Sequence, residues 1–388
     1  MTPRNLILIL STGGFASTFS SRAVEPMVGI IARDFATSPQ TIALLSAAFA
    51  LPYAFIQPIL GPVGDALGKE RVIKVALALL LATLAGAMAA PDTTILFVLR
   101  IISGAAAGGA VPLSLALIGD RVPMEERQVA LSRYLVAVIV GQLSGSSLAG
   151  LMAEFVGWRG VFGISAGMTA AALAATVIGF RGTARGGRFD LAGALSRYRE
   201  ILSIPRAVAL FAFVFVEACA LFGVFPYIAP LLELRGEGPS LAGLIIGGFA
   251  IGGLVYSALV RWMLRRLGIY RILVIGGLVA GAALVGLGQA GRWQTEALAM
   301  LGMGLGFYML HNTFQAQVTE VFPTARASTV ALHAFSFFCG QALSVVLMGA
   351  GIRSIGFPAS TAICACVIVG VGAVAAYVLS RPRQPLAR

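Results

Sequence analysis

Long apolar segments recur along this chain and constrain its fold more than any other feature. Runs of roughly 18 or more mostly apolar residues, the length that crosses a bilayer as a helix, follow one another along the whole sequence. The 388 residues are 58% hydrophobic and 11% charged, which is too apolar a composition for the surface of a soluble protein. The sequence therefore predicts an all-α integral membrane protein.

Twelve transmembrane helices are expected, and short polar turns separate most of them. A longer basic link at 181–206 divides them into two groups of six, and its stretch 190–202 predicts a short amphipathic helix on the membrane surface. The link contains Arg181, Arg185, Arg188, Arg197, Arg199 and Arg206. The predicted spans cover residues 6–30, 40–60, 72–90, 93–118, 129–152, 160–180, 207–230, 241–260, 271–290, 295–318, 328–351 and 357–380.

The distribution of Lys and Arg predicts the orientation of these helices. With the N-terminus inside, 21 of the 28 Lys and Arg residues fall in inside segments, 5 fall outside and 2 lie within spans. Cytoplasmic loops of membrane proteins carry such an excess of basic residues. Both termini are therefore expected in the cytoplasm, and the protein in the cell inner membrane. The same bias explains the net charge of +12 without a nucleic-acid partner.

The two groups of six repeat each other at an offset of about 200 residues. The segment 68–71 corresponds to 268–271, and the segment 120–123 corresponds to 320–323. Parallel repeats of this kind place a substrate path between the halves, which rock against each other to give alternating access. The sequence thus predicts an N-terminal bundle at 1–180 and a pseudo-symmetric C-terminal bundle at 207–388, joined by the link at 181–206.

Residues 61–73 resemble the loop signature of the major facilitator superfamily, which lies between its second and third spans. That signature is roughly Gly-x-Leu-Ala-Asp-Arg-x-Gly-Arg-Lys, and the chain matches it at Gly61, Asp65, Gly68 and Lys69. Ala66 and Glu70 depart from the pattern. The signature has a basic residue where this chain has Glu70, and Arg71 stands one position later. Gly68 permits a tight turn, and the Asp65 carboxylate can pair with cations or cap a helix. Together with Arg71, the matching residues are expected to form a conformational latch.

Glycines at helical spacing predict close helix contacts in the fourth and fifth spans. Arg100, followed by Gly104 and Gly108, resembles a second motif of the family. It implies a fixed positive charge that favours the ionised form of a nearby acid or assists proton release; the alternative is an arginine that snorkels to the outer surface. Gly141 and Gly145 fit the spacing of drug antiporters, although Ser146 stands where those proteins usually have proline.

The remaining polar groups within spans are few, and they predict the site. Glu217 falls near the bilayer midplane, where an unpaired carboxylate is costly, so proton coupling is expected there. A structural hydrogen bond and a substrate contact are the alternatives for Glu217. His311 is a further titrating candidate, or else a satisfied interhelical histidine. One face of the tenth span and one of the second predict a substrate pocket, with the residues Tyr308, Asn312, Gln315, Tyr53 and Gln57.

A charged pair also interrupts the first span. Arg22 and Glu25 lie three residues apart, close enough to pair on a helix. Drug antiporters that resemble this chain often carry Asp four residues before the proline that matches Pro26, where this chain has Arg22. A carboxylate paired with arginine is a poor proton carrier unless the substrate breaks the pair. The pair is therefore expected to recognise an anion or to act as a gate, with a purely structural role as the alternative.

The resemblance implies a secondary active transporter of the twelve-span drug:proton antiporter branch. It would move a small amphipathic organic molecule outward by alternating access, coupled to protons, and act as a monomer in the bilayer. Uptake or export of a sugar or another metabolite is the alternative, and a non-transporting receptor on the same fold is a third hypothesis. No metal cluster, phosphate loop or nucleophile with a base is found in the sequence, so neither an enzyme nor a cofactor is expected.

Overall fold

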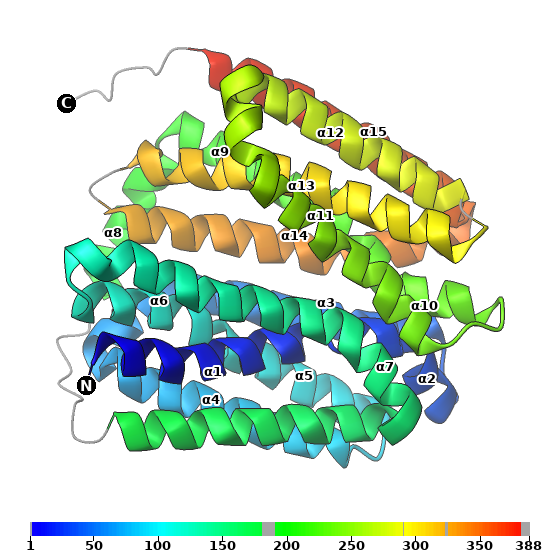
Figure 1. The fold of residues 1–388 in the computed structure, drawn as a ribbon, viewed down its shortest axis with the longest axis horizontal. Helices are drawn as coiled ribbons and strands as arrows, with labels where there is room; N and C mark the ends of the chain where they lie inside the picture. Colours follow the sequence, from blue (N-terminus) through cyan, green and yellow to red (C-terminus); the bar gives the residue numbers. More distant parts are fainter. Residues whose placement is uncertain (1, 181–190, 290, 323–324, 382–388) are drawn as a thin grey trace.

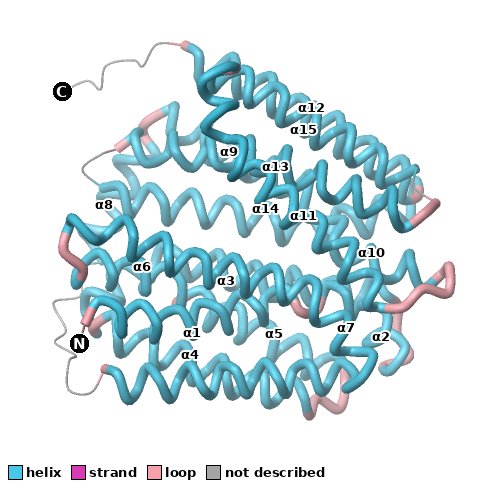
Figure 2. The backbone as a smooth tube through the Cα atoms, in the orientation of Figure 1, coloured by secondary structure: helices cyan, strands magenta, loops and turns pink. Residues whose placement is uncertain are grey.

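The computed structural model describes residues 2–180, 191–289, 291–322 and 325–381. Throughout these ranges the chain is helical with short connections, and no strand is present (Figure 2). Part of the basic link, with Arg181, Arg185 and Arg188, and the tail with Arg383 and Arg388 lie outside the described residues.

The first rod of the fold is a broken helix. It consists of α1 (Pro3–Arg22), the 3-10 turn η1 (Glu25–Met27) and α2 (Val28–Asp34). Pro26, which lacks a backbone N–H, sits within η1 and removes a helical hydrogen bond there. The break leaves Arg22 and Glu25 at the junction of the segments.

Five further helices complete the N-terminal part of the chain. They are α3 (Pro39–Leu67), α4 (Lys69–Met88), α5 (Thr93–Gly108), α6 (Ala110–Arg121) and α7 (Met124–Gly179). Gly68, with φ of 87°, ends α3 in a left-handed conformation that favours glycine. Gly157, with φ of 67°, breaks α7 into two helical segments, which agrees with the separate spans predicted at 129–152 and 160–180.

The C-terminal part of the chain repeats the broken rod. After α8 (Leu191–Leu202) come α9 (Pro205–Leu221), the 3-10 turn η2 (Phe222–Val224) and α10 (Phe225–Glu233). The remaining helices are α11 (Pro239–Arg266), α12 (Gly268–Gln289), α13 (Trp293–Val321), α14 (Arg326–Ile355) and α15 (Phe357–Ser380). The predicted amphipathic helix is α8, which buries Ala194 and Ile201 and exposes Leu195 and Leu202.

The helices gather in two groups along the sequence. Figure 1 shows α1 to α7 in the lower part of the view and α9 and α12 to α15 in the upper part, while α10 lies at the height of α3. Between the groups, α3 packs against α14 and α7 packs against α11. Near one end, α10 meets η1 and α2, so the two broken rods approach each other. The division into two bundles at the predicted boundaries stays a prediction.

Nine segments of the described chain are long and apolar enough to cross a membrane. They are Pro39–Leu67, Lys69–Met88, Thr93–Arg121, Val129–Gly179, Pro205–Glu233, Pro239–Arg266, Gly268–Gln289, Arg326–Ile355 and Phe357–Ser380. The broken helix α7 counts as one segment in this set. The set does not include α1 and α13, because they carry many polar side chains. The helices support an integral membrane fold, and the number twelve and the orientation of the termini stay predictions.

The predicted packing glycines lie where neighbouring helices approach closely. A Cβ on Gly104 would overlap the carbonyl of Phe49 in α3, and one on Gly145 would overlap the carbonyl of Phe19 in α1. A Cβ on Gly141 would likewise meet α1, at the backbone of Phe15. At Gly108 the overlap is with the side chain of Ile56.

Candidate functional site

Two buried acids, one in each broken rod, define the candidate site. In the first rod Arg22 ends α1 and Glu25 begins η1, and the Arg22 Nη1 atom lies 2.7 Å from the Glu25 Oε1 atom. The two side chains are only 7% and 3% exposed. An ion pair so removed from solvent is stable only when both partners stay together, because each charge alone would be costly.

Arg22 also reaches helices that come later in the chain. With the Gln142 amide oriented so that its oxygen faces Arg22, that oxygen accepts hydrogen bonds of 3.1 Å from Nε and Nη2. The Arg22 guanidinium lies 5.0 Å from the ring centre of Phe222 and 5.4 Å from that of Phe225. Such placement over ring faces is favourable for a cation. The arginine thereby joins α1 to α7 and to the rod α9–η2–α10.

Arg100 of α5 completes this charged cluster. Its side chain is fully buried, so it does not snorkel to a surface. Its Nη1 atom donates to the Ser20 carbonyl at 3.2 Å, and its guanidinium lies 4.3 Å from the ring centre of Phe49. Within the described residues, the Arg100 Nε and Nη2 atoms and the Glu25 Oε2 atom have no hydrogen-bond partner.

The second acid, Glu217 of α9, has a different partner. Its side chain is fully buried, and a hydrogen bond of 2.9 Å joins its Oε2 atom to the Nδ1 atom of His311 in α13. The other carboxylate oxygen, Oε1, has no partner among the residues of the described ranges. A histidine can gain or lose a proton near neutral pH, which an arginine cannot.

Both histidines of the chain lie at this second site. The rings of His311 and His333 are 5.3 Å apart, and His311 also packs on Phe307 at 4.8 Å and Phe337 at 4.9 Å. His333 of α14 is buried, and its Nε2 atom has no partner in the part of the chain that is described. His333 was not predicted as a site residue, although its place within an apolar span was a usable signal.

The predicted pocket residues fall in separate places. Tyr308 lines a cavity of about 30 Å³ together with Arg22. Gln57 donates to the carbonyls of Tyr53 at 3.4 Å and Gly108 at 3.3 Å, while the Tyr53 ring packs 4.2 Å from that of Phe338. Asn312 is half-buried and Gln315 is exposed.

The residues of the predicted latch lie together at the end of α3 and the start of α4. Lys69 pairs with Asp65 at 3.1 Å and with Asp120 of α6 at 2.8 Å. Arg71 is exposed, and at Gly61 no atom of the described residues lies within 4 Å of a Cβ built there. All the named partners belong to α3, α4 and α6, so the latching role of these residues stays a prediction.

Polar contacts join the two groups of helices at the opposite end of the molecule. Arg33 of α2 forms an ion pair with Glu233 of α10. The Glu154 Oε1 atom of α7 accepts a hydrogen bond of 3.1 Å from the backbone N–H of Ser240 in the first turn of α11, where a carboxylate is favourable. These contacts hold α2 to α10 and α7 to α11 in this conformation.

Close to that end, Asp34 pairs within the N-terminal group. It forms an ion pair with Arg159 and accepts a hydrogen bond of 3.1 Å from the Trp158 Nε1 atom. The hydrogen bond from Arg159 holds the pKa of Asp34 below its usual value. The pair anchors the end of the first rod to the start of the second segment of α7.

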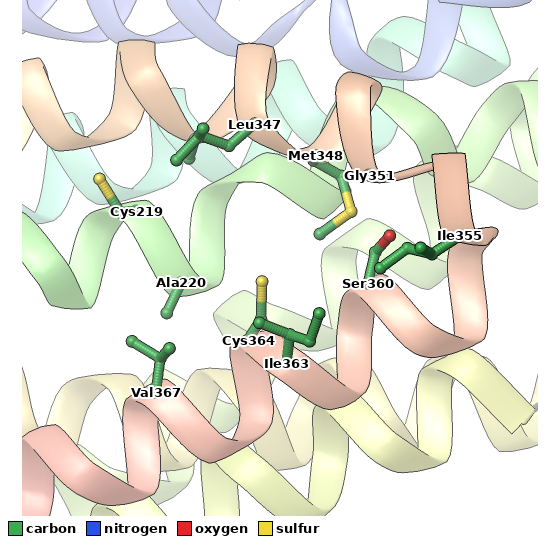
Figure 3. Close-up of a pocket in the computed structure, with 11 residues that line it drawn as sticks. Cys219, Ala220, Leu347, Met348, Gly351, Ile355, Ser360, Ile363, Cys364 and Val367 are labelled. Carbon is green, nitrogen blue, oxygen red and sulfur yellow. The ribbon is translucent and has the colours of Figure 1, made fainter. Parts of the chain in front are cut away.

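A larger cavity, of about 300 Å³, lies between α9, α14 and α15 (Figure 3). Its wall is apolar apart from Ser344, Ser360 and the thiols of Cys219 and Cys364. Leu347 and Ile363 at its rim are more than half exposed. None of the described residues that line this cavity is charged, so it is less suited to ion coupling than the two charged sites.

Comparisons with known proteins agree with this architecture. The sequence profile described as Major Facilitator Superfamily matches residues 10–331 and 210–388. The chain is 25% identical over 252 residues to the uncharacterized MFS-type transporter YwfA of Bacillus subtilis, covering 63% of this chain and 60% of YwfA. It is 32% identical over 155 residues to the multi-drug resistance efflux pump PmrA of Streptococcus pneumoniae, covering 39% of this chain and 38% of PmrA.

Each of these alignments spans less than two thirds of the relative's own length. Among solved structures, the crystal structure of a D-xylose-proton symporter is similar with a TM-score of 0.78 at 17% identity, covering 98% of both chains. At that identity the likeness concerns the fold.

Proposed function

Because this chain belongs to the major facilitator superfamily, whose members are transporters and not enzymes, we propose that it exports a small amphipathic organic molecule in exchange for protons. The relative PmrA is named as an efflux pump, which favours export over uptake. The chain is a multi-pass membrane protein, and we place it in the cell inner membrane as a monomer. The excess of basic residues on one side of the predicted topology supports the membrane orientation and has no bearing on the oligomeric state.

The proposal includes the complete topology. The rod α1–η1–α2 and helix α13 would cross the membrane, and α7 would cross it twice, on either side of the break at Gly157. With the other candidate spans this gives twelve crossings with both termini in the cytoplasm. The bundles would be 1–180 and 207–388, with 181–206 as the link. The polar side chains of α1 and α13 would then face the protein interior, where the fold can satisfy them.

The single observation that carries the proton-coupling part is the buried pair of Glu217 and His311. A charged carboxylate without solvent or a cation is strongly unfavourable, so Glu217 is stable either protonated or beside a protonated His311. Both states hold the same proton, placed on the carboxyl group in one and on the imidazole in the other. Release of that proton leaves a buried charged carboxylate, so it becomes favourable only when a conformational change brings water or a cation to Glu217. The unpartnered Glu217 Oε1 and His333 Nε2 atoms offer further positions for a proton or a water along the same path.

Movement of the pair relative to the rest of the fold would couple that proton to transport. Glu217 lies on α9 and His311 on α13, and α9 continues through η2 into α10, which contacts η1 and α2. A rocking motion of one bundle against the other would therefore change the surroundings of η2 and of the pair together. Alternating access of this kind is the general mechanism of transporters with two repeats.

Sugar transport is the second candidate, favoured by the fold likeness to the D-xylose-proton symporter. A sugar site needs many free hydrogen-bonding side chains around an otherwise apolar pocket. The Gln57 amide bonds to two backbone carbonyls instead, and Phe225 and Phe249 line the small cavity beside Arg22. These features favour an amphipathic molecule over a sugar.

The test uses purified protein in proteoliposomes, with a substrate found by resistance screening in an efflux-deficient host. Glu217→Gln keeps the hydrogen-bonding shape but cannot release a proton, so gradient-driven transport should be lost while substrate exchange without a gradient remains. Glu237→Gln, at an exposed position in the loop after α10, is the matched control and should behave as the wild type. Full gradient-driven transport by Glu217→Gln would overturn the proposal.

A further inference from the structure

We infer that the exported molecule is an organic anion, and that its carboxylate binds Arg22 in place of Glu25 while Glu25 moves to Arg100. This inference rests on the proposed function, because it names the chemical class of the substrate. The observations behind it are the charge of the cluster, the composition of the cavity beside Arg22, and the polar atoms that the present conformation leaves without partners.

The charged cluster has an excess of one positive charge. Arg22 and Arg100 both approach the last turn of α1, since Arg100 donates to the Ser20 carbonyl. Among the described residues, Glu25 is the one acid that pairs with Arg22. Arginine stays protonated in proteins, so the excess is permanent. A buried site with surplus positive charge attracts an anion and disfavours a cation.

The cavity beside Arg22 fits a molecule with an anionic head and an apolar body. Of the described residues that line it, Arg22 is the only charged one. Gln142, Ser146 and Tyr308 add hydrogen-bonding groups near it, and Phe225 and Phe249 form an aromatic wall. An arginine fork matches the two oxygens of a carboxylate.

The present volume of about 30 Å³ admits only water. The walls belong to helices of both groups: α7 supplies Gln142 and Ser146, whereas α11 supplies Phe249 and α13 supplies Tyr308. If the two groups of helices separate during alternating access, the walls of this cavity move apart and its volume increases. In the present conformation the cavity is closed around Arg22.

Unpartnered atoms show where Glu25 can go when an anion arrives. The Arg100 Nε and Nη2 atoms and the Glu25 Oε2 atom lack partners in the described part of the chain. Arg100 is close enough to Glu25 to interact with it electrostatically. If a substrate carboxylate takes the Arg22 Nη1 atom, Glu25 can turn to Arg100, and each of the two carboxylates then has its own guanidinium. The exchange forms and breaks no covalent bond.

Binding of matched probes to the purified full-length protein tests the charge preference directly. The probes are 2-naphthoate, its neutral analogue 2-naphthamide, and the cation 2-naphthylmethylammonium, measured by titration calorimetry in lipid nanodiscs without a pH gradient. We expect 2-naphthoate to bind at least about tenfold more tightly than either analogue. Equal affinity for the amide, or tighter binding of the cation, would overturn the inference.

Variants test the exchange itself. Arg22→Gln should remove the preference for 2-naphthoate. Glu25→Gln should strengthen 2-naphthoate binding, because the internal competitor for Arg22 is gone, and Arg100→Gln should weaken it. Arg133→Gln, an exposed position on the cavity-lining helix α7, is the control and should leave the affinity unchanged. Weaker 2-naphthoate binding in Glu25→Gln would contradict the exchange even if Arg22→Gln fails to fold.

Failure of this inference can be told apart from failure of the proposed function. The binding measurements need no proton gradient, so their outcome is independent of proton coupling. Proton-driven export of 2-naphthamide at the rate of 2-naphthoate would overturn the anion inference and uphold proton-coupled export. Selective binding of 2-naphthoate without any response of transport to the gradient would uphold the anion inference and overturn proton-coupled export.

Discussion

The two broken rods of this transporter are built alike but hold their acids differently. Each consists of a helix, a three-residue 3-10 turn and a second helix: α1–η1–α2 in one group and α9–η2–α10 in the other. In the first rod, Glu25 lies at the break with Arg22 and Arg100 around it. In the second, Glu217 lies within α9, and its hydrogen-bond partner is His311.

The difference between the partners suggests a division of roles. A guanidinium keeps its charge at every accessible pH, so the cluster around Arg22 is a permanent feature that suits recognition of an anion. An imidazole changes its charge near neutral pH, so the pair of Glu217 and His311 suits the uptake and release of a proton. The two acids lie at different places in the two rods, and the side chain that pairs with each acid decides what it can do.

The largest expected effect comes from removing the permanent cation of the first rod. Arg22→Met leaves the buried Glu25 carboxylate without its ion-pair partner, and should lower the free energy of unfolding by about 3 kcal/mol, the low end for breaking a buried pair. Denaturant unfolding of the purified protein, followed by intrinsic fluorescence, measures this. The double variant Arg22→Met/Glu25→Gln should recover most of the loss, and a single variant as stable as wild type would show that the pair is dispensable.

A parallel test uses the glycines that hold each rod against its neighbour. A Cβ on Gly145 of α7 would overlap the Phe19 carbonyl of α1, and a Cβ on Gly340 of α14 would overlap the Phe215 carbonyl of α9. Alanine at either position should cost about 1–3 kcal/mol of stability, because the backbones must move apart.

The control for both glycines is Gly61→Ala, which faces open space and should be neutral or slightly stabilising. The two core variants should also differ in function, with Gly145→Ala impairing binding of 2-naphthoate and Gly340→Ala impairing gradient-driven transport. If both variants weaken the same function, the division of roles between the rods is wrong.

The third prediction replaces the titratable partner of the second rod. His311→Asn can keep a hydrogen bond to Glu217 but cannot take a proton, so gradient-driven transport should fall at least about tenfold, which corresponds to roughly 1.4 kcal/mol. Binding of 2-naphthoate at fixed pH should change little. Transport rates across a range of external pH in proteoliposomes test this, and a wild-type pH profile would remove His311 from the coupling site.

The smallest effect is expected where the first rod ends. Asp34→Asn should lower the free energy of unfolding by less than about 1 kcal/mol at pH 7, as is usual for an exposed ion pair. Since Arg159 lowers the pKa of Asp34 in the folded state, the contribution is present above the unfolded pKa of about 3.9. It fades as the pH falls through the folded pKa, so the variant and the wild type should converge in acid.

Thermal unfolding at several pH values measures this difference between the two proteins. A difference that grows as the pH falls would contradict the assigned sign.

The features that depend on local spacing could be predicted from the sequence. Apolar runs of bilayer length predicted the helices, and the three-residue spacing of Arg22 and Glu25 predicted a contact that the structure has at 2.7 Å. Gly68 was expected to form a tight turn, and it has a positive φ. Such features are set by residues within one or two turns of each other.

Contacts between helices far apart in the sequence could not be predicted from local spacing. Gln142 and Phe222 surround Arg22 only because α7 and the second rod pack against α1. Glu217 and His311 were each selected as titratable groups within spans, but nothing in their separation of 94 residues predicted that they would bond. His333 joins them through the packing of α14, which helical periodicity does not determine.

The most direct test asks which buried acid takes up the proton. Difference infrared spectroscopy of the protein in nanodiscs, as the pH is lowered, detects the carbonyl stretch of a newly protonated carboxylic acid. If Glu217 carries the proton, this band should appear in the wild type and in Glu25→Gln and should be absent in Glu217→Gln. A band that persists in Glu217→Gln and disappears in Glu25→Gln would contradict the assignment and transfer the proton to the first rod.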